Sequence, residues 1–166
     1  VNADLRSITE INEALRQRAD ITQEGQWIRA FKYDDTKLAE GRPINRFDID
    51  QVVPNHPVVV GHRGGHTGVY NSMALALAGI TSETPDPQGG RFYRDSNGVL
   101  TGLVAGPARS VFNSLIPSDS SRAQRRDGIK LITELMTKAG LTSVHQTGAG
   151  RNDMIAYQDA RAEGGM

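Results

Sequence analysis

The sequence reads GLTSVHQTGAG from Gly140 to Gly150, between two segments with helical patterns. Leu141 to His145 has the composition of a short buried strand, and the glycines on either side are typical of turns. A helix, a strand, a glycine turn and a second helix in this order are typical of a parallel sheet covered by helices. The sequence therefore predicts an α/β fold.

Both flanking helices have start signals in the sequence. Ser121 and Gln124 have the spacing of a capping box, and Gly140 ends the helix that follows them. Asn152 is placed to cap the last helix, which we expect to run to about Ala162. The first of these helices has an apolar face made of Ile129, Ile132, Met136 and Ala139, widened by Leu131 and Leu135.

The rest of the chain also predicts a mixture of helices and strands. In a strand over residues 27–33, Trp27, Phe31 and Tyr33 fall on one face. The other expected elements are a helix over 8–19 capped by Ser7, a loop over 34–48, a buried strand at 58–60, a short helix capped by Asn71 and ended by Gly79, and a hairpin of 91–94 with 99–103 around Asn97-Gly98.

Charge and composition exclude several function classes. The chain has 166 residues, with 19 basic side chains against 19 acidic ones, and only 5% of its residues are aromatic. We therefore expect no nucleic-acid partner and no membrane partner, and no apolar run approaches the roughly 20 residues that cross a bilayer. The absence of cysteine excludes disulfides and thiolate sites and leaves the cellular compartment open. Because the chain begins at Val1 without a signal peptide and ends at Met166 just after a helix, we interpret it as a segment of a longer protein.

Three of the four histidines are candidates for chemistry. His66 follows Gly64 and Gly65 in a glycine-rich loop, where an imidazole and backbone N–H groups can approach a ligand. His145 lies at the carboxyl end of the predicted strand, which is the ligand-facing end in α/β folds. His62 and His66 have helical metal-ligand spacing, but the glycines between them disfavour a helix. Histidines that only bond nearby main chain are the alternative at each position.

Several short motifs resemble one family when they are taken in order over roughly residues 5–150. They are Gly25-Gln26-Trp27-Ile28, Asp48-Ile49-Asp50 before Pro54, His56-Pro57-Val58-Val59-Val60, Gly65-His66, Asn71-Ser72 with Ala74-Leu75, Gly79-Ile80-Thr81, Gly89-Gly90, Asp95 with Gly98, Thr101-Gly102-Leu103, and Gly140-Leu141-Thr142-Ser143-Val144-His145. This ordered set resembles the YtcJ-like branch of the metal-dependent amidohydrolases, the amidohydrolase 3 group.

The resemblance implies a partial (β/α)8 TIM-barrel segment with an inserted α+β region of short strands and a hairpin. Within one compact domain, residues 1–50 then carry the first barrel helix and a strand, residues 51–118 form the insertion, and residues 119–166 form a helix–strand–helix barrel unit. The family hydrolyses amide-type C–N bonds with a metal-activated water, and its metal ligands come from strands outside this segment. We therefore expect no catalytic residue and no metal ligand in this chain, zinc in the full-length parent, and no activity in the segment alone.

The resemblance also implies roles for three residues. His66 and Asn71 match a motif near the family's active-site mouth, and His145 matches a strand end that the family commonly continues with aspartate, where this chain has Gln146. We expect all three to bind a small-molecule amide-type substrate, and we expect unpaired strand edges and apolar faces to favour a homo-oligomer. The alternatives are a non-enzymatic α/β module that binds a ligand or partner, and a self-sufficient zinc site of His62, His66 and His145.

Overall fold

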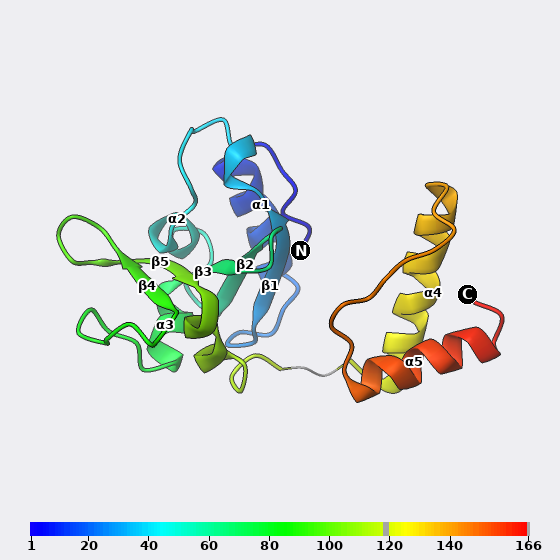
Figure 1. Cartoon of the computed structure of the whole chain (residues 1–166). Coiled ribbons are helices and arrows are strands. Elements are labelled where there is room, and N and C mark those ends of the chain that lie inside the picture. The colour runs from blue at the N-terminus through cyan, green and yellow to red at the C-terminus, as the bar shows by residue number, and fades with distance from the viewer. Residues whose placement is uncertain (118–119, 166) are drawn as a thin grey trace. The chain divides into compact units, whose positions relative to one another are not determined.

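The computed structural model describes residues 1–117 and 120–165 of the chain (Figure 1). The chain divides into two compact units, Val1–Pro117 and Ser118–Met166, and the predicted single compact domain with its three parts stays a prediction. Within the first unit, β1 (Ile28–Tyr33) and β2 (Val58–His62) lie on either side of the expected boundary at residue 50 and pair with each other. One sheet therefore joins the two parts that the sequence separates there.

The first unit is built on a five-stranded mixed sheet with the strand order β1-β2-β3-β5-β4. β1 and β2 are parallel, and the other neighbours are antiparallel. The three further strands are β3 (Thr67–Tyr70), β4 (Arg91–Arg94) and β5 (Leu100–Ala105). The predicted α/β class, the strands at 27–33 and 58–60 and the hairpin are confirmed. β3 has no counterpart among the predicted elements, and the barrel itself stays a prediction.

Helices cover both faces of this sheet. On one face, α1 (Ile8–Ala19) and α2 (Arg46–Asp50) pack on Val58 and Val60. On the other face, α3 (Ser72–Leu77) and the 3-10 helix η2 (Gly106–Phe112) pack around Val59. Figure 1 shows α1 and α3 on opposite sides of the sheet. Because successive residues of a strand point to opposite faces, the three valines of β2 belong to two separate cores.

The buried face of β1 differs from the expected one. Ile28 and Ala30 are buried, whereas Phe31 is 52% exposed. Lys32 has a φ of 68°, in the left-handed region, and the pairing register with β2 shifts between Ala30 and Tyr33. This irregularity returns Tyr33 to the buried face after one extra residue. The predicted shared face of Trp27, Phe31 and Tyr33 is therefore wrong, because strict alternation does not hold at a bulge.

The predicted loop over residues 34–48 contains two short helical elements, η1 (Asp35–Lys37) and the start of α2. Asn45 caps α2, because its side chain accepts from the N–H groups of Phe47 and Asp48. Asp48 completes a capping box by accepting from the Asn45 N–H at 2.9 Å. The loop interpretation is wrong at this end, because capping stabilises a helix of only five residues.

Asn71 is completely buried between β3 and α3, and its side-chain amide is fully hydrogen-bonded. Its Oδ1 accepts from the Val58 N–H at 2.9 Å and from the Ala74 N–H at 3.1 Å. Its Nδ2 donates to the carbonyls of Val53 at 3.3 Å and His56 at 2.8 Å. Asn71 thus caps α3, as predicted, and also fixes the first residue of β2 and the segment that leads into it.

The second unit consists of α4 (Arg122–Lys138) and α5 (Arg151–Ala162), joined by residues 139–150. The capping box of Ser121 and Gln124 is confirmed, since both reciprocal hydrogen bonds are present. Asn152 is not the cap of α5: the helix begins after Gly150, whose N–H donates to Asp153 at 3.0 Å. An acidic side chain in the first turn therefore takes over the capping.

The predicted strand from Leu141 to His145 is wrong for this chain. These residues carry no regular secondary structure, and Val144 is 64% exposed. A strand needs a neighbour for its backbone hydrogen bonds, and residues 120–165 contain no strand that pairs with this segment. The sequence pattern is that of a strand, but the second unit does not supply its partner.

Several ion pairs connect the helices of the second unit. Arg122 bonds Asp159 at 2.6 Å, and Arg125 bonds Asp153 at 3.1 Å. Lys130 bonds Glu163, the residue that follows α5. The buried residues in the described part of the second unit are the small Ala156 and Ala160. None of the described helices has the length and hydropathy that a membrane span requires.

We expect the Asn71→Ala variant to be less stable by about 3 kcal/mol or more, because a helix cap is lost and buried N–H and C=O groups lose their partners. Urea unfolding followed by circular dichroism measures the difference. The matched control is Asn97→Ala at the exposed hairpin tip, for which we expect less than about 0.5 kcal/mol. Equal stability of the two variants would contradict the structural role of Asn71.

Gly102 and Gly98 provide a second test of the sheet. Both have positive φ, 88° and 79°, but a Cβ at Gly102 would lie 2.4 Å from the Tyr70 carbonyl oxygen, whereas a Cβ at Gly98 meets nothing within 4 Å. We expect Gly98→Ala to cost about 1 kcal/mol from backbone strain alone, and Gly102→Ala to cost more than about 3 kcal/mol. Thermal unfolding of both variants measures the difference, and similar values would contradict the close approach at Gly102.

Candidate functional site

His66 lies at the tip of the hairpin formed by β2 and β3, in which Gly61 is paired with Gly68. η2 holds this tip: the Gly106 N–H donates to the His66 carbonyl at 2.9 Å, and Arg109 donates to the Gly65 carbonyl. The His66 side chain itself is exposed and makes no hydrogen bond or ion pair within the described residues. The main chain of the tip is held by hydrogen bonds and the imidazole is exposed, and the role of His66 in substrate binding stays a prediction.

Asn71 stands in contrast to His66. It lies at the other end of β3, completely buried, and its amide contacts four main-chain groups. These contacts account for the donors and acceptors of the side chain. The role of Asn71 in substrate binding stays a prediction, and the observed contacts are those of a residue that positions β2 and α3.

His145 belongs to the second unit, in the exposed segment before α5. Its ring makes no hydrogen bond within the described residues, and Gln146 beside it is exposed as well. Neither unit contains both His66 and His145. The predicted shared role of the three residues, and the zinc site of His62, His66 and His145, therefore stay predictions.

A group that sequence reasoning missed lies where the parallel strands β1 and β2 end. Oxygen atoms of Asp34 and Asp35 and a ring nitrogen of His62 lie within 4.8 Å of one another. The pairing of Tyr33 with His62 brings these residues together, although they are far apart in the sequence. The signal that points to them is their common place after the carboxyl ends of two neighbouring parallel strands.

The hydrogen bonds of this group do not fit a metal site. Asp34 accepts from the Thr36 hydroxyl at 2.7 Å and contacts Arg63 at 3.0 Å. The hydrogen bond from Thr36, together with the charge of Arg63, holds the pKa of Asp34 below its ordinary value. The carboxylate is therefore already neutralised by a cation from the chain itself.

The histidine of the group is also unsuited to a metal. The Gly64 N–H donates to Nδ1 of His62 at 3.0 Å, so in the neutral ring the proton lies on Nε2, which faces Asp35 at 3.2 Å. A metal at that position needs the Nε2 lone pair. These contacts do not fit the metal implied by the family resemblance, and the group is a network of hydrogen bonds with an ion pair between Arg63 and Asp34.

Tyr33, the last residue of β1, is buried beside this group. Its hydroxyl accepts from the Ile44 N–H at 2.9 Å, and its ring meets the His62 ring edge to face, with 5.9 Å between the centroids. Burial raises the pKa of Tyr33 to about 12. The phenol therefore stays neutral at physiological pH and fixes the segment that leads to α2.

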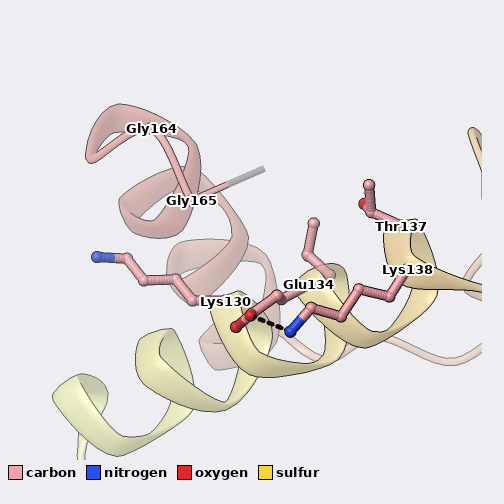
Figure 2. A pocket seen from close by; sticks show the side chains of 7 residues that line it. Lys130, Glu134, Thr137, Lys138, Gly164 and Gly165 are labelled. Carbon is pink, nitrogen blue, oxygen red and sulfur yellow. Dashed lines mark hydrogen bonds and ion pairs between the residues drawn. The ribbon is translucent and has the colours of Figure 1, made fainter.

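The second unit has a shallow hollow beside α4, shown in Figure 2. Its charged groups already have partners: Lys138 donates to Glu134 at 2.6 Å, and Lys130 bonds Glu163. The hollow contains none of the predicted site residues, and its lining residues are Lys130, Thr133, Glu134, Thr137, Lys138, Gly164 and Gly165.

The chain is similar to much longer proteins. The N-substituted formamide deformylase of Arthrobacter pascens is 29% identical over 165 residues, which cover 98% of this chain and 30% of that protein. The putative amidohydrolase YtcJ of Bacillus subtilis (strain 168) is 29% identical over 169 residues, covering 97% and 32%. The chain thus spans about a third of the length of the curated relatives it matches.

Two solved structures resemble the fold. They are uncharacterized metal-dependent hydrolases from Pyrococcus horikoshii OT3 and Pyrococcus furiosus, with TM-scores of 0.56 and 0.54. The sequence identities are 21% and 23%, so the likeness concerns the fold. The matches cover 99% and 98% of this chain and 30% and 31% of those chains.

The family model described as "Amidohydrolase family" matches residues 2–166, nearly the whole chain. This match agrees with the ordered motifs in the sequence and with the relatives. The chain belongs to the amidohydrolase family.

Proposed function

We propose that this chain forms part of the substrate-pocket wall of a metal-dependent hydrolase that acts on non-peptide, amide-type C–N bonds. The family match over residues 2–166 carries the proposal. The similarity to a formamide deformylase supports a small amide-type molecule as the substrate. In this proposal the chain is a partial TIM-barrel segment.

The metal of the parent enzyme, which we propose to be zinc, is held outside this chain. The group of Asp34, Asp35 and His62 is occupied by Arg63 and by its own hydrogen bonds, so it does not compete for the ion. The chain by itself therefore lacks the group that polarises a scissile carbonyl. We expect it to be catalytically inactive in isolation.

His66 is the residue of this chain that contacts the substrate in our proposal. η2 fixes the main chain of the hairpin tip through Gly106 and Arg109, and the free imidazole extends from it. A preorganised ring nitrogen at this place donates to a substrate carbonyl, or to the oxyanion that forms from it, without rearrangement of the backbone.

We also propose that the chain self-associates. Six large apolar side chains in the second unit are 44–64% exposed, and residues 141–145 carry no regular secondary structure. Exposed apolar patches and unpaired strand-like segments favour association.

The purified chain should neither hydrolyse N-substituted formamides nor retain a divalent metal. Mass spectrometry of the metal content after dialysis, and a chromatographic amidase assay, measure both properties. Stoichiometric zinc together with turnover would contradict the proposal that the metal ligands lie elsewhere.

In a full-length hydrolase that contains this segment, His66→Ala should lower kcat by about 10²-fold, the usual effect of removing one oxyanion donor, while the metal content is unchanged. His66→Gln, which keeps a hydrogen-bond donor, should recover part of the loss. The matched control is Asn97→Ala at the tip of the other hairpin, which should leave kcat unchanged. Full activity of His66→Ala would exclude the role of this residue.

A further inference from the structure

The two peptide groups on either side of the His66 Cα are both held by η2. The peptide group before it carries the Gly65 carbonyl, which accepts from Nη1 of Arg109. The peptide group after it carries the His66 carbonyl, which accepts from the Gly106 N–H at 2.9 Å. Because the planes of the two flanking peptide groups set φ and ψ of a residue, η2 holds both backbone angles of His66.

η2 is itself packed into the second core of the sheet. The Phe112 ring at its end stacks on the Tyr70 ring of β3, with 3.7 Å between the centroids, and both side chains are buried. A Cβ at Gly90 would collide with the main chain of Ala108, so the turn before β4 lies directly against η2. The groups that hold the hairpin tip therefore belong to a packed element and not to a free loop.

The side chain of Arg109 reaches the tip across β3 at Gly68. This glycine is buried, and a Cβ built on it would lie 3.6 Å from Nε of Arg109. The absence of a side chain at Gly68 leaves the space in which the arginine crosses the strand. The sequence of β3 thus provides the path by which a residue of η2 contacts the Gly65 carbonyl.

The contacts of Arg109 are concentrated on this tip. Its Nε is buried without a hydrogen-bond partner among the described residues, and Nη1 bonds the Gly65 carbonyl. Arg63, in the same hairpin, bonds the carboxylate of Asp34 instead. A charged donor holds a carbonyl more strongly than a neutral one does, so the guanidinium is well suited to fix the peptide group before His66.

We propose that Arg109 is a positioning residue for His66. Its guanidinium holds the peptide group between Gly65 and His66, and thereby the direction in which the imidazole leaves the backbone. Gly64 and Gly65 permit a wide range of backbone angles, so this peptide group can rotate when the bond from Arg109 is lost. The inference rests on the proposed contact of His66 with substrate and adds the residue through which the fold orients that contact.

The His66 N–H tests the contact in the chain itself, because it belongs to the peptide group that Arg109 holds. Amide nitrogen relaxation should give an order parameter of about 0.85 for this N–H in the native chain and below about 0.6 in Arg109→Met, which keeps the stem and removes the donors. The Thr67 N–H belongs to the peptide group that Gly106 holds, and its order parameter should not change. An unchanged His66 value, or an equal fall at Thr67, would overturn the proposal.

Two further variants separate the hydrogen bond from a general effect of losing an arginine. Arg109→Lys keeps a charged donor and should restore most of the rigidity of the His66 N–H. Arg91→Ala is the matched control, because Arg91 is exposed on β4 and its guanidinium lies over the Tyr93 ring. This control should leave the His66 order parameter unchanged, and circular dichroism checks that all variants are folded.

The consequence for catalysis is tested in a full-length hydrolase that contains this segment. Arg109→Met should lower kcat by about 10-fold, because a misplaced contacting group loses part of its effect. The double variant with His66→Ala should be no slower than His66→Ala alone, since Arg109 acts through His66. Losses that multiply in the double variant would overturn the positioning role.

Failure of this inference and failure of the proposed function give different results. Full activity of His66→Ala would exclude the proposed substrate contact, and the relaxation of the His66 N–H would still decide whether Arg109 holds the tip. A loss of kcat in His66→Ala without any loss in Arg109→Met would overturn the positioning role and leave the substrate contact standing.

Discussion

The side-chain amide of Asn71 is the interaction on which the first unit depends. It bonds the first N–H of β2, the start of α3 and two carbonyls of the segment that precedes β2. These contacts determine where β2 begins, and β2 is the strand with a core on both sides. The hairpin that carries His66 continues from β2, so the place of the imidazole follows from hydrogen bonds at the other end of the strand.

Local signals in the sequence were sufficient for the elements that depend on local physics. The cap at Ser7, the capping box at Ser121, the run of three valines and the Asn97-Gly98 turn each lead to an observed element. The signals failed where the outcome depends on a distant partner. Leu141–His145 has the composition of a strand without a neighbour to pair with, and the bulge at Lys32 is not visible in a strict alternation.

The candidate site was predictable only in part. A glycine-rich context singles out His66, and the structure places it exposed at a turn whose backbone η2 fixes. Asn71 is recognisable as a cap, but its contacts with Val53 and His56 arise from folding and have no sequence signature. The group of Asp34, Asp35 and His62 is created by the parallel register of β1 and β2, which no spacing along the chain indicates.

The two units differ in the physical nature of what holds them together. The first has two apolar cores, whereas α4 and α5 are joined by partly exposed ion pairs around two alanines. Dissolved salt screens exposed charges over about 10 Å at 0.1 M ionic strength, but it does not weaken buried apolar contacts in the same way. We therefore expect rising ionic strength to weaken the contact of α5 with α4 before it affects the sheet and its covering helices.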